Sequence, residues 1–301
     1  MYLAKSLKSF WKSTNLPLAG FETWRSMSAL VVTLYARKGG VGRTLLTQNL
    51  SGACAEHGGT VLVIDLDPQA SLSKNFFGRD YVERLRPHQT IAALFDDKRE
   101  PIADEIIQPT KVEQISVAPS SDYLEAYDLP TPLERGEQQF FIRDFVEEVR
   151  ERFDLILIDT PPNIANLMAW GALMASDYVI TPVQPEKNSC EGVLDVKLRL
   201  QMAIRHGNSE LVDLGYFVNN LDARTSNHRV MEEELRQLYG TQVFETVIHR
   251  RTDFQSVQHS GKPITHEKPK SAEAEMIRSL LLEIIERVQN YRQGEKQRGA
   301  A

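Results

Sequence analysis

The chain has 301 residues, of which 42% are hydrophobic and 25% are charged, as expected for a soluble globular protein with one large or two small domains. Its formal net charge of −6 argues against a globally basic nucleic-acid-binding protein but allows a local basic patch. No apolar run approaches the ~20 residues needed to cross a bilayer, and residues 1–28 lack the apolar core of a secretory signal. Because Cys54 and Cys190 are far apart and fit no metal spacing, the sequence predicts a cytoplasmic protein with reduced thiols.

Residues 1–28 differ in pattern from the rest of the chain. Lysines lie mostly away from one predicted helical face, which collects the apolar side chains Leu3, Leu7, Phe10 and Trp11. A basic amphipathic helix can lie on a membrane or dock on a partner, so any membrane contact would use this segment. Two other interpretations stay open. The segment is a disordered or packing extension, or it precedes the natural start, since Met27 opens a strand-first domain.

From residue 29 onward, apolar strands alternate with helices. The predicted strands are residues 29–36, 60–67, 113–120, 153–162, 177–185, 214–222 and 242–249. Helices are expected at 43–57, 137–152 and 271–290, with further helical stretches between the later strands. This alternation predicts an α/β fold with a doubly wound, mainly parallel sheet and helices on both faces. We expect one domain at 29–290, followed by a polar tail at 291–301.

The stretch "KGGVGRT", residues 38–44, lies between the first predicted strand and the first predicted helix. Its glycines allow successive backbone N–H groups to turn inward around phosphate oxygens. The following helix adds the partial positive charge of its N-terminus, and Thr44 at its start offers a hydroxyl to Mg²⁺. The position between strand and helix is the one that a phosphate-binding loop requires.

Carboxylates follow two of the predicted strands. Asp65 and Asp67 stand at the end of the second strand in "VIDLDPQ", and alternation along a strand lets both reach the same side. Asp159 ends the apolar strand "LILIDTPP". Ligands of open α/β sheets bind at the carboxyl ends of the strands, so these acids are expected at the phosphate loop.

With Lys38 directly before Gly39 and Gly40, and with the two acidic strand ends, the chain resembles the ParA/MinD family of P-loop ATPases, whose loop is a deviant Walker A motif. Within that family it is most similar to the ParA/Soj branch of DNA-partitioning proteins, over nearly all of 29–290. The resemblance implies ATP and Mg²⁺ as cofactors and a weak ATPase stimulated by a ParB-like or other partner. It also implies an ATP-dependent homodimer, in which Lys38 reaches the phosphates held by the other subunit and residues 181–192 meet that subunit.

The resemblance also assigns roles to single residues. Asp67 positions or activates the attacking water, Asp65 supports the metal shell and Asp159 holds Mg²⁺ with Thr44, while 160–162 resembles the switch that senses the γ-phosphate. Asn220 recognises adenine, and His249 stands where the family often has proline. The nucleotide is expected to contact the loop residues Lys38, Gly39, Gly40, Val41, Gly42, Arg43, Thr44 and Leu45.

Arg43 departs from the family pattern, which has lysine at that position. The lysine contacts the β- and γ-phosphates as a compact point charge. Arginine keeps the charge and can donate to phosphate, but it is longer and planar. Nucleotide binding is therefore expected to survive with Arg43 as a catalytic contact, and the hydrolysis rate is left open.

Basic residues of the C-terminal third resemble those with which ParA dimers hold DNA without sequence preference. The candidates are Arg224, Arg229, Arg250, Arg251 and Lys262. The alternative is a set of solvated helix faces, with the arginines paired to Glu232, Glu233 and Glu234. The C-terminal end is too polar for the membrane-targeting helix of the MinD branch.

Two functions follow from these observations. In the first, the protein is an ATP-dependent, nucleoid-associated switch that positions a plasmid, a chromosome locus or other cargo on DNA. In the second, Arg43 has slowed turnover, and the protein is a nucleotide-locked scaffold that recruits a partner at a cell pole or membrane. ATP turnover with and without DNA and the partner distinguishes the two.

Overall fold

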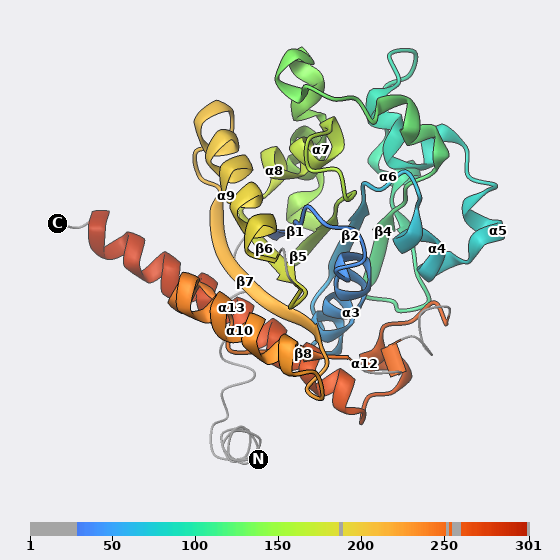
Figure 1. Ribbon diagram of the computed structural model, residues 1–301. Coiled ribbons are helices and arrows are strands. Elements are labelled where there is room, and N and C mark those ends of the chain that lie inside the picture. The colour runs from blue at the N-terminus through green and yellow to red at the C-terminus, as the bar shows by residue number, and fades with distance from the viewer. Residues whose placement is uncertain (1–28, 187–188, 251–252, 255–259, 300–301) are drawn as a thin grey trace.

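The computed structural model describes residues 29–186, 189–250, 253–254 and 260–299 (Figure 1). The predicted N-terminal extension and Arg251 lie outside the described residues. An eight-stranded sheet forms the centre, in the order β3-β4-β2-β5-β1-β6-β7-β8. Its strands are β1 (Leu30–Leu34), β2 (Val61–Asp65), β3 (Gln108–Pro109), β4 (Ile115–Ala118), β5 (Leu155–Asp159), β6 (Tyr178–Val183), β7 (Val212–Leu221) and β8 (Ile248–His249).

Every strand pair is parallel except that of β3 with β4, so the predicted doubly wound α/β fold is confirmed. The strands read as unbroken apolar runs because helices cover both faces of the sheet. Alternate residues of β1 enter different cores: Leu30 and Val32 belong to one hydrophobic cluster, and Val31 belongs to another.

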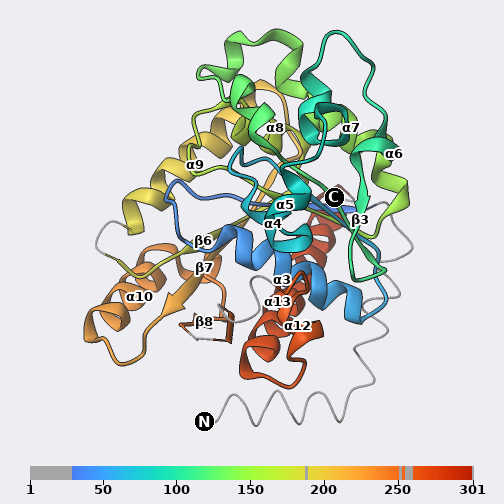
Figure 2. The same ribbon diagram turned by 90° about the vertical axis from the view of Figure 1, so that its right-hand side faces the viewer.

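Helices cover the two faces of the sheet as Figures 1 and 2 show. On one face α3 (Arg43–Glu56) packs against α12 (Ile264–Glu267) and α13 (Ala272–Gly299). On the other face lie α7 (Phe141–Val149), α8 (Leu167–Ala175) and α9 (Ser189–His206). The other α-helices of the described residues are α4 (Ser71–Phe77), α5 (Arg79–Val82), α6 (Ala103–Ile106) and α10 (Ser226–Tyr239).

Three details differ from the sequence prediction. The strand expected at 242–249 is reduced to β8, because Gly240–Gln242 forms a 3-10 turn and Val243 makes only an isolated bridge to Tyr216. The edge strand β3 was not predicted, and its Pro109 is tolerated because an edge strand needs fewer N–H donors. Helix α13 continues to Gly299 through the predicted tail, where Tyr291 packs edge-on against Tyr178.

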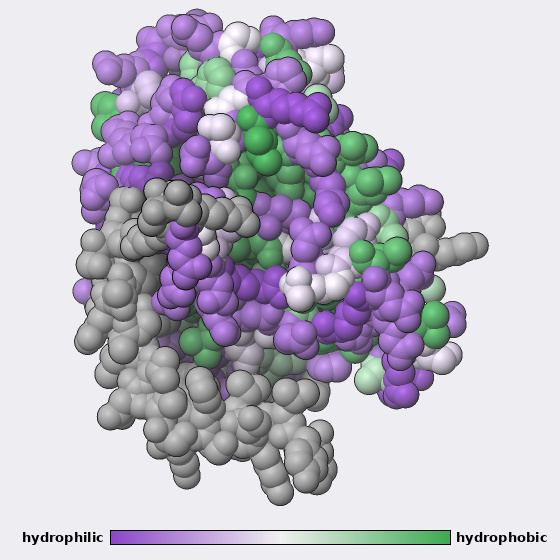
Figure 3. All heavy atoms as spheres, turned by 90° about the vertical axis from the view of Figure 1, so that its left-hand side faces the viewer, coloured by the Kyte–Doolittle hydropathy of each residue, from purple (hydrophilic) through white to green (hydrophobic). Residues whose placement is uncertain are grey.

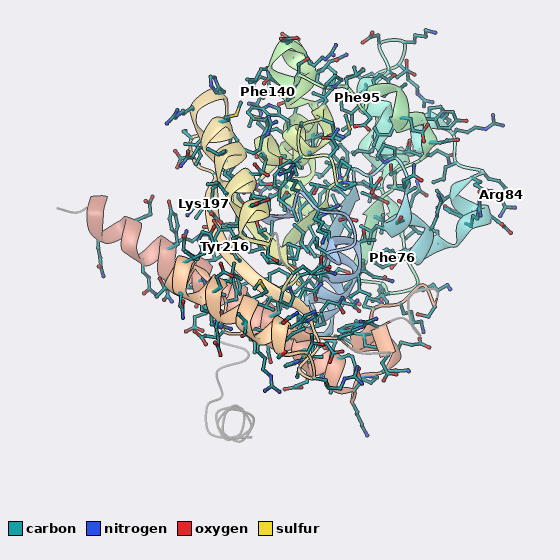
Figure 4. All side chains as sticks on the ribbon, in the orientation of Figure 1. Phe76, Arg84, Phe95, Phe140, Lys197 and Tyr216 are labelled. Carbon is teal, nitrogen blue, oxygen red and sulfur yellow. The ribbon has the colours of Figure 1, made fainter. Side chains whose placement is uncertain are left out.

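The described surface seen in Figure 3 is largely hydrophilic, with small hydrophobic islands. Within the described ranges, no helix is both long enough and apolar enough to cross a membrane. On α9, Lys197 lies beside Tyr216 of β7 (Figure 4), with its ammonium 6.0 Å from the centre of the Tyr216 ring. The same ammonium is 5.2 Å from the ring of Tyr239, so α9, β7 and α10 share this contact.

A bulge in β7 gives the first testable prediction. Gly215 has a φ of 120°, and a Cβ at this position would collide with the carbonyl oxygen of Gln242. Gly215→Ala should therefore lower the free energy of unfolding by at least about 2 kcal/mol in urea denaturation. The control is Gly192→Ala in α9, where a Cβ meets nothing within 4 Å, and a gain of ~0.5–1 kcal/mol is expected. Equal effects of the two substitutions would contradict this account of the bulge.

Candidate nucleotide-binding site

The glycine-rich loop connects the end of β1 to the start of α3, at the carboxyl edge of the sheet. Gly40 and Gly42 have φ values of 76° and 90°, which favour glycine over residues with a Cβ. Gly42 is the N-cap of α3, and no side chain caps the helix there. The first N–H groups of this fourteen-residue helix are therefore available to an anion.

Thr44 and Asp159 meet beside the loop. The Thr44 hydroxyl donates to Oδ2 of Asp159 at 2.6 Å. The other carboxylate oxygen, Oδ1, is buried and has no hydrogen-bond partner among the described residues. A buried carboxylate with an unpaired oxygen beside a hydroxyl fits Mg²⁺, which prefers oxygen ligands. Burial, with the neighbouring charge of Asp65, raises the pKa of Asp159 to about 8.

Asp65 is fully buried one strand away and pairs in register with Asp159. Its Oδ2 accepts from the backbone N–H and the hydroxyl of Ser73, at 2.9 and 2.7 Å, and its Oδ1 accepts from the N–H of Asp67 at 3.1 Å. Burial raises its pKa to about 7, although the Ser73 hydrogen bonds act in the opposite direction. Asp65 thus fastens the start of α4 to β2, and its role in the metal shell stays a prediction.

Helix α4 is held at its other end by Phe76, which is 1% exposed and labelled in Figure 4. Asp67 lies in the segment that connects β2 to α4 and is half-buried. Its Oδ1 accepts from the N–H of Gln69 at 2.9 Å. Burial raises the pKa of Asp67, while the hydrogen bond from Gln69 and the charge of Arg43 lower it. The position of Asp67 next to the phosphate loop is compatible with the predicted role in positioning water, which remains a prediction.

Arg43 is buried, with 7% of its surface exposed. Its Nε donates to the carbonyl oxygen of Thr160 at 3.0 Å, and its Nη1 donates to the carbonyl oxygens of Ala36 and, at 3.0 Å, Lys38. The sequence predicted a phosphate contact for this side chain. In the structure, three of its N–H groups donate to backbone carbonyls, and the phosphate contact stays a prediction.

Lys38, in contrast, is exposed and its ammonium pairs with the carboxylate of Glu186. The same segment after β6 supports the loop from outside, because Gln184 Nε2 donates to the carbonyl oxygen of Gly40 at 2.7 Å. The structure therefore places the two cations of the loop in opposite surroundings, one buried and one in solvent.

A pocket of about 800 Å³ opens beside the glycine loop. Its volume lies within the range of small-molecule sites. Its walls come from the phosphate loop, the end of β7 and the β8 region, with Gly40, Gly42, Leu45, Asn220, His249 and Phe254 among the lining residues. Asn220 is half-buried with a φ of 60°. Its contact with adenine stays a prediction, and the pocket that Asn220 lines offers a place for the base.

Sequence reasoning missed several residues that shape this site. Asn219 is buried and its Nδ2 donates to the carbonyl oxygen of Val41 at 2.6 Å, which fixes the loop from β7. The strand period could have indicated it, since only one of two adjacent asparagines at a strand end can face the loop. Gln184, Glu186 and Ser73 gave no such signal, because their partners are distant in the sequence.

The predicted basic residues are partly brought together. Arg224 and Arg250 line the pocket. Arg229 of α10 donates to the carbonyl oxygen of Ala223, the residue before Arg224. The Arg224 guanidinium bonds both oxygens of Asp222, at 3.0 and 2.9 Å, so that part of its charge is neutralised. Lys262 lies apart from them in the turn before α12, beside Gly261, which packs against α4.

A glycine loop between strand and helix, with a threonine and a buried aspartate beside it, defines a P-loop nucleotide-binding protein. A family model described as an AAA domain matches residues 29–212. The sporulation initiation inhibitor protein Soj of Bacillus subtilis is 30% identical over 84% of this chain and 97% of its own. The chromosome-partitioning ATPase Soj of Thermus thermophilus is 31% identical over 86% of this chain and 96% of its own. The chain therefore belongs to the ParA/MinD family of P-loop ATPases.

Solved structures show the same fold. The septum site-determining protein MinD of Pyrococcus horikoshii, complexed with Mg-ADP, aligns with a TM-score of 0.69 at 22% identity, over 85% of this chain and 96% of that one. Cobyrinic acid a,c-diamide synthase of Mycobacterium smegmatis, with a bound ATP analogue and magnesium, also gives 0.69, at 23% identity over 84% and 93%. At these identities the likeness concerns the fold.

The buried acids predict how stability depends on pH. Because the folded-state pKa of Asp159 is raised to about 8, the folded protein keeps a proton that the unfolded chain loses above about pH 4. The free energy of unfolding should therefore fall by about one to a few kcal/mol between pH 5 and pH 8.5. Asp159→Asn should flatten this dependence, as measured by urea denaturation in buffers without divalent ions. Asp144→Asn, at an exposed position on α7, is the control and should keep the wild-type slope. A wild-type slope in Asp159→Asn would remove this carboxylate as the cause.

Proposed function

We propose that this protein is an ATP-dependent dimerising switch that binds DNA without sequence preference and positions a plasmid, a chromosome locus or other cargo. The observation that carries the proposal is the junction of the glycine loop with the Thr44–Asp159 pair, where Oδ1 of Asp159 has no partner among the described side chains. Membership of a family that includes chromosome-partitioning ATPases supports the cellular role.

ATP and Mg²⁺ are the proposed cofactors. Thr44 and Asp159 would hold the metal ion, which neutralises charge on the phosphates during their transfer. The N–H groups at the start of α3 would bind the phosphates, and the adjoining pocket would hold the base. Asp67 would position the attacking water, and a ParB-like or other partner would stimulate hydrolysis.

The exposure of Lys38 supports the proposal of ATP-dependent dimerisation. A cation that is 59% exposed and paired only at the surface can reach a second copy of the chain at small cost. DNA retention is proposed for Arg224, Arg229, Arg250 and Arg251, whose guanidinium groups would neutralise backbone phosphates. A location on the nucleoid would follow from DNA retention.

The experiment that tests the function measures whether the wild-type protein is retained on non-specific DNA with ATP and Mg²⁺ and is released with ADP. Retention that is the same with either nucleotide would overturn the switch. A second candidate, the nucleotide-locked scaffold, is favoured by the engagement of Arg43 with backbone carbonyls. ATP turnover that stays absent with DNA and a partner would support the scaffold instead.

Lys38 provides a test of the dimer. Lys38→Ala should bind ADP within about threefold of the wild type, because its ammonium pairs with Glu186 in the single chain. The variant should nevertheless fail to dimerise with a non-hydrolysable ATP analogue in size-exclusion chromatography. Arg37→Ala, at the neighbouring exposed cation, controls for the loss of a surface charge. An ATP-dependent dimer of Lys38→Ala would show that the lysine does not act across an interface.

Arg250 provides a test of the DNA surface. Each phosphate contact that is lost reduces the salt dependence of binding by roughly one unit of the logarithmic slope. Arg250→Glu should therefore weaken DNA retention and flatten its salt dependence, as measured by fluorescence anisotropy over a range of NaCl concentrations. Arg143→Glu on α7 is the matched control, since Figure 1 places α7 far from β8. Equal retention of both variants would remove Arg250 from the surface.

A further inference from the structure

Arg43 joins two segments that act on the nucleotide in the proposed function, on which this inference rests. Ala36 and Lys38 belong to the start of the phosphate loop, and Thr160 follows Asp159 directly at the end of β5. The guanidinium lies between them and donates to a carbonyl oxygen of each residue. Residues 36 and 160 are far apart in the sequence, so this side chain is a long-range tie.

Other contacts hold the same junction. The Thr160 hydroxyl donates to the carbonyl oxygen of Leu34 at 2.9 Å, and Thr160 is 1% exposed. A Cβ on Gly39 would lie 3.7 Å from the Cβ of Pro162, so the loop runs against the segment 160–162. The charges of Asp159 and Asp67 stabilise the buried guanidinium and oppose the effect of burial, which lowers the pKa of Arg43.

A lysine could not make the same set of contacts. The guanidinium is planar and directs Nε–H and Nη1–H to separate acceptors, whereas an ammonium places all its donors on one atom. Turning the guanidinium toward a phosphate would leave buried carbonyl oxygens without their donor, which is costly. Lys38 and the first N–H groups of α3 have no such commitment to the interior.

We propose that Arg43 is a positioning residue, a brace that holds 160–162 against the phosphate loop with either nucleotide bound, and that it is not a phosphate ligand. The terminal phosphates are then contacted by Lys38 and the backbone of the loop. The segment that resembles a γ-phosphate sensor would not move when ATP is replaced by ADP, because its first carbonyl is held from inside the protein.

Hydrogen–deuterium exchange of the full chain tests the brace. In the wild type, at a concentration at which the protein is monomeric with either nucleotide, the amides of Thr160 and of residues 163–167 should exchange at the same rate with Mg-ADP and with a non-hydrolysable ATP analogue. In Arg43→Lys they should exchange at least tenfold faster without nucleotide, and the analogue should protect them more than ADP does. Titration calorimetry should give an ADP affinity for Arg43→Lys within tenfold of the wild type.

Arg150→Lys is the matched control. This half-buried arginine also donates to a backbone carbonyl, that of Ala29 at 3.1 Å, and pairs with Asp177, away from the loop. It should leave exchange at 160–167 unchanged.

Three results would overturn the proposal: unchanged exchange at 160–167 in Arg43→Lys, a tenfold or greater loss of ADP affinity in that variant, or the same acceleration in Arg150→Lys. A difference between the two nucleotides in the monomeric wild type would overturn it as well. Exchange without nucleotide requires no DNA, dimer or turnover, so its result is separate from the fate of the proposed function.

Discussion

Burial of charge at the carboxyl edge of the sheet is the constraint on which the site depends. Parallel pairing of β2 with β5 puts Asp65 and Asp159 in register, and both are almost completely removed from solvent. Burial raises the pKa of both carboxyls, and the charge of Asp65 raises that of Asp159 further, unless donors or cations stabilise the charged forms. The hydroxyls of Ser73 and Thr44, the guanidinium of Arg43 and, in the proposed function, a divalent cation supply that compensation.

The two carboxylates differ in their hydrogen bonds, and this difference indicates different roles. Asp65 uses both oxygens for hydrogen bonds and thereby fixes α4 and the segment that carries Asp67. Asp159 keeps one oxygen without a partner in the described structure, and that difference makes it the better candidate for a metal ligand. The two cations divide similarly. Arg43 is buried and donates to backbone carbonyl oxygens. Lys38 stays at the surface, where its ion pair with Glu186 can be replaced by another contact.

The features that could be predicted from the sequence are those that depend on a local residue pattern. Buried strands, the glycine loop and the acidic strand ends are visible because apolar runs and turn residues are contiguous in the chain. The direction of the Arg43 side chain was not predictable, because its acceptors Ala36 and Thr160 meet only after β1 and β5 pair. The contacts of Asn219 and Gln184 with the loop were missed for the same reason. At β8, a strand-like composition was overridden by the turn at Gly240.

The predicted DNA surface and the pocket share a wall, which bears on how the proposed switch would work. Arg224 and Arg250 line the pocket, and Arg250 is held to β7 by its backbone N–H, which donates to the carbonyl oxygen of Leu221 at 2.9 Å. A ligand that fills the pocket would contact the two segments that present these arginines, the loop after β7 and the end of β8. A ligand shifts an equilibrium only through contacts that differ between two states. In the proposed function, this shared wall would therefore couple nucleotide occupancy to DNA affinity. Asp222 interacts with both arginines, because it forms an ion pair with Arg224 and its pKa is also lowered by the charge of Arg250. In the proposed function, its carboxylate would compete with DNA phosphates for both guanidinium groups, so a change in its position would alter the charge that this surface presents.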